Sequence, residues 1–499
     1  MTIVREDVKI EESVAVNATL RAVAFAVASV GLGTLAFTIA GRVTSPWPLE
    51  WMEGGVLHHA LRFAHGEAIY VPPSADFIPY LYPPLAYLPI ALMVTLGYPS
   101  LATMRCVSIL WLMISLLAIA RMARRGASHP MAGWVASGMF ALGFGYTGAF
   151  LDLARVDGFF IMLMACGVER LQAKRTRTGL WFLALSGFAK QHGFLLLLAA
   201  SATTAIRDRR NALQVVGPPL CAVVLALWAL NRTSEGWFWT YVLELPSTHG
   251  VVWPLAFTFV FVDLLLYLPV LTASAIVLFK RNFQSWDPSV AALVAAIIVS
   301  ALGRAHPGGD DNVRLPAFAL LCGLALAPLL RTMLSVKAKR STRLLIAALL
   351  LGQAAMLWQP PSLHQPTARS SHQFLTLLKT LDRCGRSASG ENKRDAVALD
   401  FPLLTNVPFM HTMALSDLSL GQGIPRLARQ ARHSLVERLA SKSAPHSIAV
   451  GNTFPQLDAA LASYYTECAI VEAPRMPTGY QPPAQHIYRR RAAHEATRD

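Results

Sequence analysis

The chain has 499 residues, of which 54% are hydrophobic and only 15% are charged, and its mean hydropathy is +0.43. Soluble domains carry about 25% charged residues, so this composition excludes a soluble enzyme, a disordered protein and a fibrous protein. The net charge of +15 does not indicate nucleic-acid binding, because the Lys and Arg residues lie in short clusters between apolar runs. The composition predicts an all-α, multi-pass membrane protein, with membrane lipids as its surroundings.

Basic clusters between apolar runs set the predicted topology, because short loops rich in Lys and Arg stay on the cytoplasmic side. Residues 1–18 contain several acidic residues, unlike a signal peptide, and are predicted to be a cytoplasmic tail. Residues 19–358 are predicted to form the transmembrane domain, with about eleven apolar segments of spanning or half-spanning length and an outer loop over residues 41–100. We expect this domain in a bacterial inner membrane, with the N-terminus inside.

Three of the apolar stretches that follow the first span at residues 22–40 are informative about the topology. Residues 83–97 contain three prolines and are too short to span, so an interfacial or re-entrant helix is predicted there. Residues 131–150 and 212–230 carry no charge, and each is predicted to be a membrane-spanning helix.

The apolar run over residues 179–206 is interrupted by Lys190, Gln191 and His192. A single crossing would put the basic clusters at its two ends on opposite faces, whereas two short segments that meet at Lys190 keep both inside. Broken helices occur where a membrane protein encloses a polar cavity. Lys190 is therefore predicted to lie at the floor or rim of an outward-facing cavity. The alternative is a lysine that extends from a helix end toward the interface.

Residues 359–499 are polar, and their apolar runs are no longer than a buried strand, so a small extracytoplasmic α/β domain is predicted. Its expected strands are residues 396–399, 447–450 and 469–471, and its expected helix is residues 457–465. Cys384 and Cys468 both lie here, and an exported domain permits a disulfide between them.

Charged residues outside the basic loops gather on the predicted outer side. They include Glu50, Glu53, Asp152, Arg155, Asp157, Lys190 and several residues between Arg304 and Arg314. Charge near membrane depth is costly and usually faces a functional cavity. Carboxylates mixed with Arg and Lys suit a reaction at an anionic leaving group, because a carboxylate deprotonates the acceptor while the cations bind phosphate oxygens. The alternative is a structural ion pair between Asp152 and Arg155, which are three residues apart.

Four motifs occur in a fixed order along residues 19–330. They are the acidic residues Glu50 and Glu53 after the first span, Gly66-x-x-x-Tyr70, Tyr82-Pro83-Pro84-Leu85, and the second outer loop from Asp152 to Asp157. In this order they resemble the GT-C superfamily of membrane glycosyltransferases, which includes protein O-mannosyltransferases, lipid A aminoarabinose transferases and oligosaccharyltransferases. Each motif alone is weak, and their order is the more specific signal.

The resemblance implies transfer of a hexose or pentose from a polyprenyl-phosphate-linked donor to a lipid, glycan or protein acceptor on the outer face. It also implies a first-loop carboxylate as general base. Met52 stands where relatives have the usual catalytic Asp, so Glu53 or Glu50 takes that role, and Glu53 is the residue expected to deprotonate the acceptor hydroxyl. The expected catalytic residues are Glu53, Glu50 and Asp157. The expected substrate-binding residues are Asp152, Arg155, Lys190, Gln191, Tyr82 and Arg314.

Two other classes fit the same charges. A transporter or flippase of lipid-linked sugars would use the cations for translocation, and inverted repeats would favour it, but none is visible. A non-catalytic envelope assembly protein would have lost the chemistry. No cofactor is expected, and a divalent metal at Asp310 and Asp311 is not favoured, because two adjacent carboxylates are too few for a cage.

Overall fold

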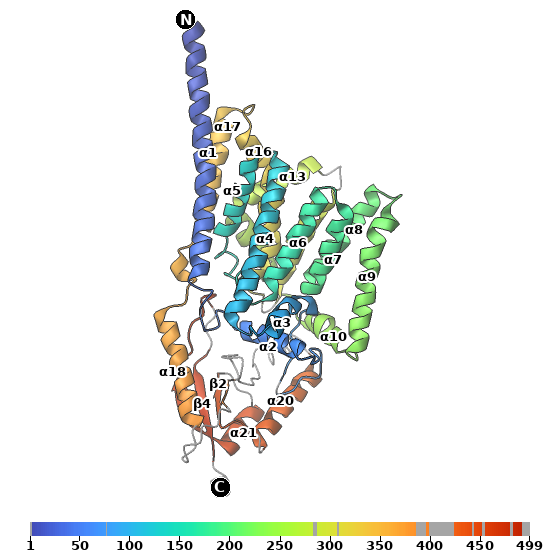
Figure 1. The fold of residues 1–499 in the computed structure, drawn as a ribbon, viewed down its shortest axis with the longest axis vertical. Helices are drawn as coiled ribbons and strands as arrows, with labels where there is room; N and C mark the ends of the chain where they lie inside the picture. The colour runs from blue at the N-terminus through green and yellow to red at the C-terminus, as the bar shows by residue number, and fades with distance from the viewer. Residues whose placement is uncertain are drawn as a thin grey trace.

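The computed structural model describes most of the chain. The described residues are 2–75, 77–282, 287–306, 309–385, 396–398, 424–441, 444–451, 455–479 and 483–491. They form a bundle of helices and a small sheet at one end of it (Figure 1). Helix α1 (Thr2–Ala40) extends beyond the bundle at the end opposite the sheet, so the N-terminus lies far from the C-terminal elements.

The bundle continues from α1 with helices joined mostly by short turns. They are α4 (Leu101–Ala127), α5 (Pro130–Leu142), α6 (Val156–Gln172), α7 (Thr176–Ala189), α8 (His192–Arg207), α9 (Ala212–Thr233), α13 (Pro269–Asn282), α14 (Pro288–Ala305), α15 (Leu315–Leu320), α16 (Ala327–Leu334) and α17 (Arg340–Leu357). Six described helical stretches are long and apolar enough to cross a membrane, or seven if one bent pair counts as a span. The larger number expected from the sequence stays a prediction.

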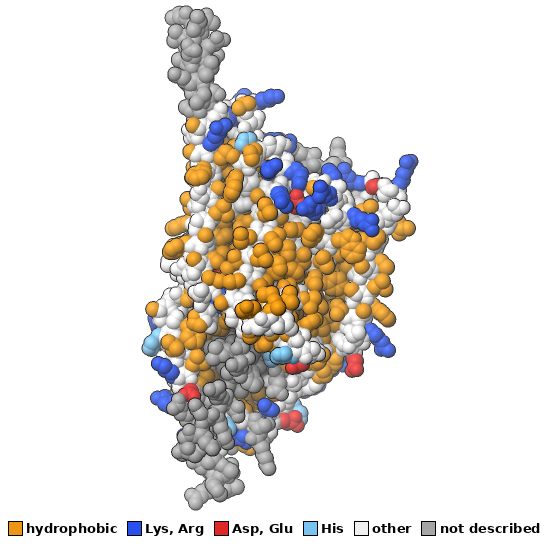
Figure 2. Space-filling model, in the orientation of Figure 1, with side chains coloured by type: hydrophobic (Ala, Val, Ile, Leu, Met, Phe, Trp, Pro, Cys, Tyr) orange, Lys and Arg blue, Asp and Glu red, His pale blue; other side chains and the backbone are white. Residues whose placement is uncertain are grey.

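A broad apolar surface surrounds the middle of the bundle. On the face drawn in Figure 2, hydrophobic side chains form a band, and basic side chains gather at its edge away from the sheet. Large apolar residues on the bundle helices are exposed, among them Trp134 on α5, Trp228 on α9 and Met113 on α4. An exposed apolar surface of this extent indicates contact with lipid. The chain is therefore a multi-pass membrane protein.

Small residues let the backbones of α1 and α5 touch. A Cβ atom added to Gly31 would lie 2.1 Å from the carbonyl oxygen of Gly138, and one added to Gly138 would meet the backbone of α1. Membrane helices use such small residues to pack closely. This contact holds α1 against the bundle, and with it the loop that follows α1.

The uncharged run over residues 131–150 is helical for only part of its length. Helix α5 ends at Leu142, and the chain then turns through residues 143–150, where Gly148 has φ 76° and Ala149 has φ 59°. The expectation of a spanning helix over this whole run was wrong. The run is apolar throughout, but Gly143, Gly145 and Gly148 favour turns over helix.

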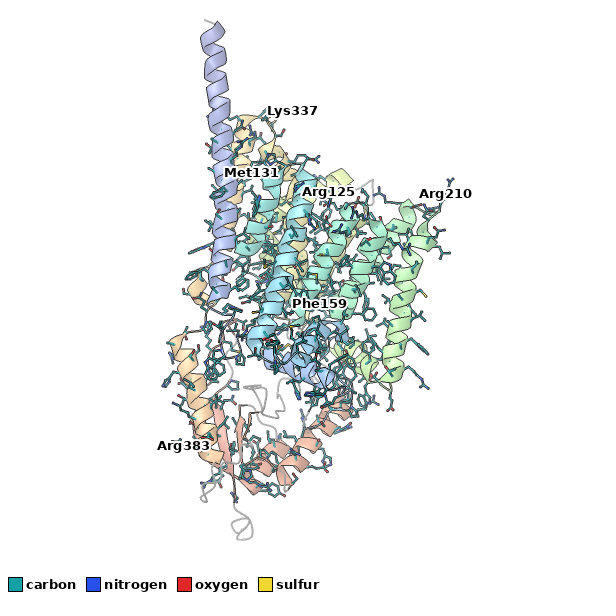
Figure 3. All side chains as sticks on the ribbon, in the orientation of Figure 1. Arg125, Met131, Phe159, Arg210, Lys337 and Arg383 are labelled. Atoms are coloured by element: carbon teal, nitrogen blue, oxygen red, sulfur yellow. A yellow bond between two sulfur atoms is a disulfide. The ribbon has the colours of Figure 1, made fainter. Side chains whose placement is uncertain are left out.

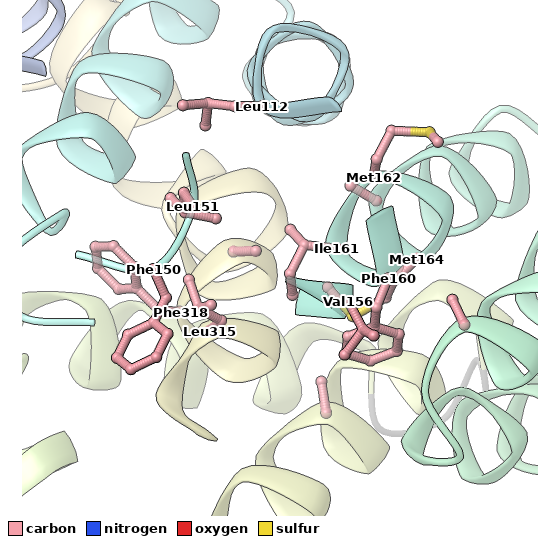
Figure 4. Packing of buried hydrophobic residues seen from close by; sticks show 14 of the residues in the cluster. Leu112, Phe150, Leu151, Val156, Phe160, Ile161, Met162, Met164, Leu315 and Phe318 are labelled. Carbon is pink, nitrogen blue, oxygen red and sulfur yellow. The ribbon is translucent and has the colours of Figure 1, made fainter. Parts of the chain in front are cut away.

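A buried apolar cluster supports the loop between α5 and α6. Figure 4 shows Val156, Phe160 and Ile161 of α6 near Leu151 of the loop and Phe318 of α15. All five are buried, so the start of α6 and the loop before it have fixed positions.

Two sequence-based predictions on broken or short segments are confirmed. Helix α7 ends at Ala189 and α8 begins at His192, with Lys190 extended between them at φ −150° and ψ 128°. Residues 83–97 form only η1 (Pro84–Ala86) and the eight-residue α3 (Leu88–Thr95), too short to cross a bilayer. The first outer loop also contains α2 (Glu53–Ala64).

The C-terminal sheet has the strand order β1-β2-β4-β3. Strand β1 (Ala396–Ala398) is parallel to β2 (Ser447–Val450), and β4 (Gln485–Arg490) is antiparallel to both β2 and β3 (Tyr465–Val471). The expected strands therefore form, although Leu399 lies outside the described residues. The helices beside the sheet are α18 (Ala368–Gly385), α20 (Pro425–Ala440) and α21 (Pro455–Tyr464). Strand β4, α18 and α20 were not expected from the sequence.

A disulfide joins Cys384 at the end of α18 to Cys468 in β3, across 84 residues of sequence. We expect Cys384→Ser to destabilise the C-terminal elements by about 2–4 kcal/mol, because the cross-link restricts the unfolded chain. Limited proteolysis after α17 should become faster. Cys106→Ser, at an exposed free cysteine in α4, is the control and should change nothing. Equal proteolysis of both variants would contradict the prediction.

Candidate functional site

The candidate site lies at the end of the bundle that faces the C-terminal sheet. The loop after α1, the loop between α5 and α6, the break between α7 and α8, and η4 (Asp311–Arg314) all reach this end. Helix α6, which carries Phe159 in its first turn (Figure 3), contacts η1 of the first outer loop. The four segments therefore bring distant parts of the sequence together.

Five polar residues form what we call the central cluster: Glu50, Arg155, Asp157, Lys190 and Asn312. Arg155 pairs with Glu50 at 2.8 Å (Nη1 to Oε1) and with Asp157 at 3.2 Å (Nε to Oδ2). The Lys190 Nζ lies 2.7 Å from Asp157 Oδ1, and the Asn312 amide donates to the same oxygen at 3.1 Å. The cluster thus holds two cations and two carboxylates in one connected network.

Local backbone geometry explains three of these positions. Arg155 is the N-cap residue of α6, with an extended backbone (φ −132°, ψ 166°), and Asp157 lies in the first turn. A carboxylate in the first turn is stabilised by the helix dipole. Lys190 is the extended residue where α7 stops. All three charged positions therefore follow from helix ends that point into the site.

Two more predicted residues adjoin the central cluster. The Tyr82 hydroxyl accepts from Arg155 Nη2 at 3.5 Å, and the Lys190 Nζ lies 5.8 Å from the centre of the Tyr82 ring. The Gln191 amide donates to the carbonyl oxygen of Leu81 at 3.0 Å. Gln191 therefore holds the Tyr-Pro-Pro-Leu segment in place, and Tyr82 lies against both cations of the cluster.

The Glu50 carboxyl has the electrostatics of a general base. It lies in the loop after α1, only 1% exposed, and its Oε2 accepts from the Met52 backbone N–H at 2.9 Å. Burial raises the pKa of Glu50 to about 7, because the loss of water outweighs the attraction of Arg155. A carboxyl with a pKa near neutral can accept a proton at physiological pH and hold it.

Glu53 has a different environment. Its two oxygens accept from Arg105 at 2.9 and 2.7 Å, and also from the backbone N–H groups of Leu49 at 2.7 Å and Ala154 at 3.0 Å. Burial alone would raise the pKa of Glu53, but Arg105 and these N–H groups outweigh it and hold the pKa below its usual value. Glu53 therefore ties two outer loops to α4, and both of its oxygens are engaged by these donors.

Asp152 is engaged by a residue that sequence reasoning did not consider. Arg42 donates to both of its oxygens, at 2.7 and 3.0 Å, and also to the carbonyl oxygens of Ala149 and His364, each at 2.8 Å. The alternative ion pair between Asp152 and Arg155 is not the one that forms. Arg42 and Asp152 instead fasten the loop after α1 to the loop before α6 and to the segment after α17.

Arg314 belongs to a neighbouring cluster. Its guanidinium lies 3.1 Å from Asp263 and 2.7 Å from Asp311, and it donates to the carbonyl oxygen of Tyr146 at 2.6 Å. These contacts hold η4, so that Asn312 reaches Asp157. In the described part of the chain, no three His, Cys, Asp or Glu residues are placed to hold a metal ion.

Sequence reasoning missed Arg42, Arg105 and Asn312. Arg105 carried a usable signal, because it is the one charge in an otherwise apolar run over residues 101–120, and such a charge needs a partner. Arg42 and Asn312 lie in short polar segments that resemble ordinary loops. Their partners are far away in sequence, so no local pattern identifies them.

An open cavity of about 920 Å³ adjoins this site. Its lining comes from the loop before α6, from the α17–α18 connection and from the turn between β3 and β4, and includes Gly148, His364, Arg369 and Arg475. The hydroxyl of Thr478, also in the lining, donates to the carbonyl oxygen of Leu49 at 3.3 Å. The cavity therefore lies between the bundle and the sheet, beside the loop that carries Glu50.

Comparison with known proteins places this geometry in a fold family. No protein-family profile and no curated protein sequence matches the chain. The aminoarabinose transferase ArnT from Cupriavidus metallidurans, bound to undecaprenyl phosphate, aligns over 95% of this chain and 98% of its own, with a TM-score of 0.54 and 12% identity. Its apo structure aligns over 97% and 99%, with a TM-score of 0.50 and 13% identity.

The Archaeoglobus fulgidus oligosaccharyltransferase in its apo form aligns over 87% of this chain and 69% of its own, with a TM-score of 0.52 and 10% identity. At such low identities the likeness establishes the fold. It agrees with the resemblance that the order of motifs in the sequence indicates. The chain has the fold of the GT-C membrane glycosyltransferases.

Proposed function

We propose that the protein is a glycosyltransferase that moves one hexose or pentose from a polyprenyl-phosphate carrier to an acceptor on the extracytoplasmic face of a bacterial inner membrane. The central cluster carries the proposal, because it combines a carboxyl of near-neutral pKa with two cations that suit a phosphate leaving group. The fold supports it, since a neighbour of this fold was solved with undecaprenyl phosphate.

The orientation follows from the positive-inside rule. Arg125, Arg210 and Lys337 lie at the end of the bundle away from the sheet (Figure 3). We call this the basic end and propose that it is cytoplasmic. Residues 1–18 would then be a cytoplasmic tail, residues 19–358 the transmembrane domain, and residues 359–499 an extracytoplasmic domain over the site.

The proposed reaction uses the central cluster directly. The acceptor hydroxyl oxygen attacks the anomeric carbon of the sugar, its proton passes to Glu50, and the bond from that carbon to the phosphate oxygen breaks. The phosphate leaves with one more negative charge, which Arg155 and Lys190 neutralise. Asp157 holds both cations in position. The open cavity beside the Glu50 loop would admit the acceptor.

The other predicted residues take supporting roles in this proposal. Tyr82 lines the phosphate site, because it touches Arg155 and Lys190. The remaining residues hold loops in place through the contacts described above; they are Glu53, Asp152, Gln191 and Arg314.

The direct test is transfer from a panel of radiolabelled polyprenyl-phosphate sugars by purified full-length protein, with Glu50→Gln alongside. Sugar release that depends on Glu50 would support the proposed glycosyltransferase activity and identify the sugar donor. Tight binding of the same lipids without turnover, unchanged in Glu50→Gln, would favour a flippase or an assembly protein instead.

Lys190→Met is expected to raise the KM for the lipid-linked donor about 10–100-fold, because it removes one charged hydrogen bond to phosphate. Lys190→Arg should recover part of the loss. Lys174→Met is the matched control, since Lys174 is 69% exposed and pairs with Asp287 at the basic end. Donor titrations with all three variants check this. An unchanged KM in Lys190→Met would remove Lys190 from the phosphate site.

A further inference from the structure

A second cavity, of about 750 Å³, opens at the basic end of the bundle, between the ends of α4 and α6 and the starts of α5 and α7. We call it the arginine pocket. It is lined by Arg121, Arg124, Arg125, Arg170 and Arg175, together with Ser128, His129, Pro130, Glu169 and Ala173. Two separate stretches of the chain, residues 121–125 and 170–175, thus contribute cations to one concave surface.

The arginine pocket has a large excess of positive charge. Its lining has five arginines and one carboxylate, that of Glu169, whose side chain is 4% exposed. Arg125 pairs with Glu169 at 2.9 Å and Arg170 pairs with it at 3.2 Å. The side chains of Arg121, Arg124 and Arg175 are exposed and form no ion pair or hydrogen bond within the described parts of the chain. Bringing these cations together without an anion is unfavourable.

The arginine pocket lies at the depth of lipid headgroups. In Figure 2 the basic side chains gather where the apolar band ends, and Figure 3 places Arg125 at this level. Trp134 on α5 and Trp181 on α7 lie within two helical turns of the pocket residues Pro130 and Arg175. Their side chains are 63% and 36% exposed. Exposed tryptophans beside basic residues are typical of the membrane–water interface.

The arginine pocket is separate from the candidate site. Helix α4 carries Arg105 at the candidate site and Arg125 at the pocket, and twenty residues of helix span about 30 Å. A lipid bound at one position would therefore not contact the other.

We infer that the arginine pocket binds the phosphate group of an anionic membrane phospholipid. Arginine is suited to this ligand, because its planar guanidinium donates two parallel hydrogen bonds to phosphate oxygens. The cavity is large enough for a headgroup, and basic side chains gather at the edge of the apolar band (Figure 2), beyond which acyl chains would extend. Basic pockets between membrane helices on the cytoplasmic side recognise such headgroups.

The bound lipid connects the end of α4 to the start of α7. Phosphate oxygens would connect Arg121 and Arg124 of α4 to Arg175 at the start of α7, where no protein carboxylate does so in the described residues. Lipid binding should therefore raise the thermal stability of the whole protein.

The test measures lipid binding to purified full-length protein by native mass spectrometry and thermal unfolding. Cardiolipin and phosphatidylglycerol are compared with phosphatidylcholine and with inorganic phosphate. The variant combines Arg121→Gln, Arg124→Gln and Arg175→Gln. The control combines Arg209→Gln, Arg210→Gln and Lys337→Gln, which removes the same charge from exposed positions at the same end.

The pocket variant should bind anionic lipid about a hundredfold more weakly, while the control binds as the original protein does. Arg124→Gln alone should give a smaller loss in the same direction. If variant and control lost the same amount of lipid affinity, the effect would come from general surface charge, and the inference would be overturned. Stabilisation by inorganic phosphate but by no lipid would assign the pocket to a free anion. Neither outcome bears on the sugar-transfer assay.

Discussion

Glu50→Gln is expected to lower the rate of sugar transfer by about 10²–10⁴-fold, which is the usual contribution of a general base. The amide keeps the shape of the carboxyl and its hydrogen bond to Met52, but it cannot accept the proton. The protein should fold normally, because Arg155 keeps its ion pair with Asp157 when Glu50 loses its charge. Single-turnover measurement with a lipid-linked sugar donor separates this loss of rate from a change in binding.

The same variant should lose the pH dependence of transfer. Since the pKa of Glu50 is raised to about 7, the carboxyl is protonated and inactive below that pH. The value of kcat/KM should rise tenfold per pH unit in the acid range and level off above about 7. The free energy of unfolding changes with pH in the opposite direction. Because the pKa of Glu50 is raised in the folded protein, its stabilising contribution is fully present below pH 4.5 and is lost as the pH rises through 7.

Glu53→Gln is the comparison for both measurements. Glu53 accepts from Arg105 and from two backbone N–H groups, so its replacement should weaken folding more than catalysis. A normal rate in Glu50→Gln together with an inactive but fully stable Glu53→Gln would reverse the proposed assignment and return the base to Glu53.

Arg105→Met is expected to destabilise the protein by about 3–5 kcal/mol, because it leaves the Glu53 carboxylate buried without a cation. Both side chains are fully buried, and Arg105 also donates to the carbonyl oxygens of Ser45 at 2.6 Å and Trp47 at 2.8 Å. The loop that carries Glu50 would lose its attachment to α4. Thermal unfolding of the purified protein in detergent measures the loss.

A double variant isolates the buried charge. Arg105→Met combined with Glu53→Gln removes both charges and keeps an amide oxygen for one backbone donor, so it should be more stable than Arg105→Met alone. Arg177→Met, at an exposed arginine of the basic end, is the matched control and should leave the unfolding temperature unchanged. If the double variant is less stable than the single one, the unpaired charge is not the cause.

Local patterns in the sequence determined the membrane class, the basic clusters, the break at Lys190 and most strands of the C-terminal sheet. These features depend on neighbouring residues: apolar length, prolines, and the alternation of polar and apolar side chains. The early end of α5 at Leu142 shows the limit of such reasoning, because hydropathy alone did not reveal the turns at its glycines.

Only the tertiary structure decided which charges meet. Glu53 and Arg105 are 52 residues apart, Arg42 and Asp152 are 110 apart, and Asp157 and Asn312 are 155 apart. The sequence placed the carboxylates on one side of the membrane but could not pair them with cations, since a buried charge takes whichever partner the folded backbone brings within reach. Because Arg105 pairs with Glu53, the Glu53 carboxylate is held by structural contacts and its pKa is lowered. Glu50, beside Arg155, keeps a raised pKa that suits it to accept a proton.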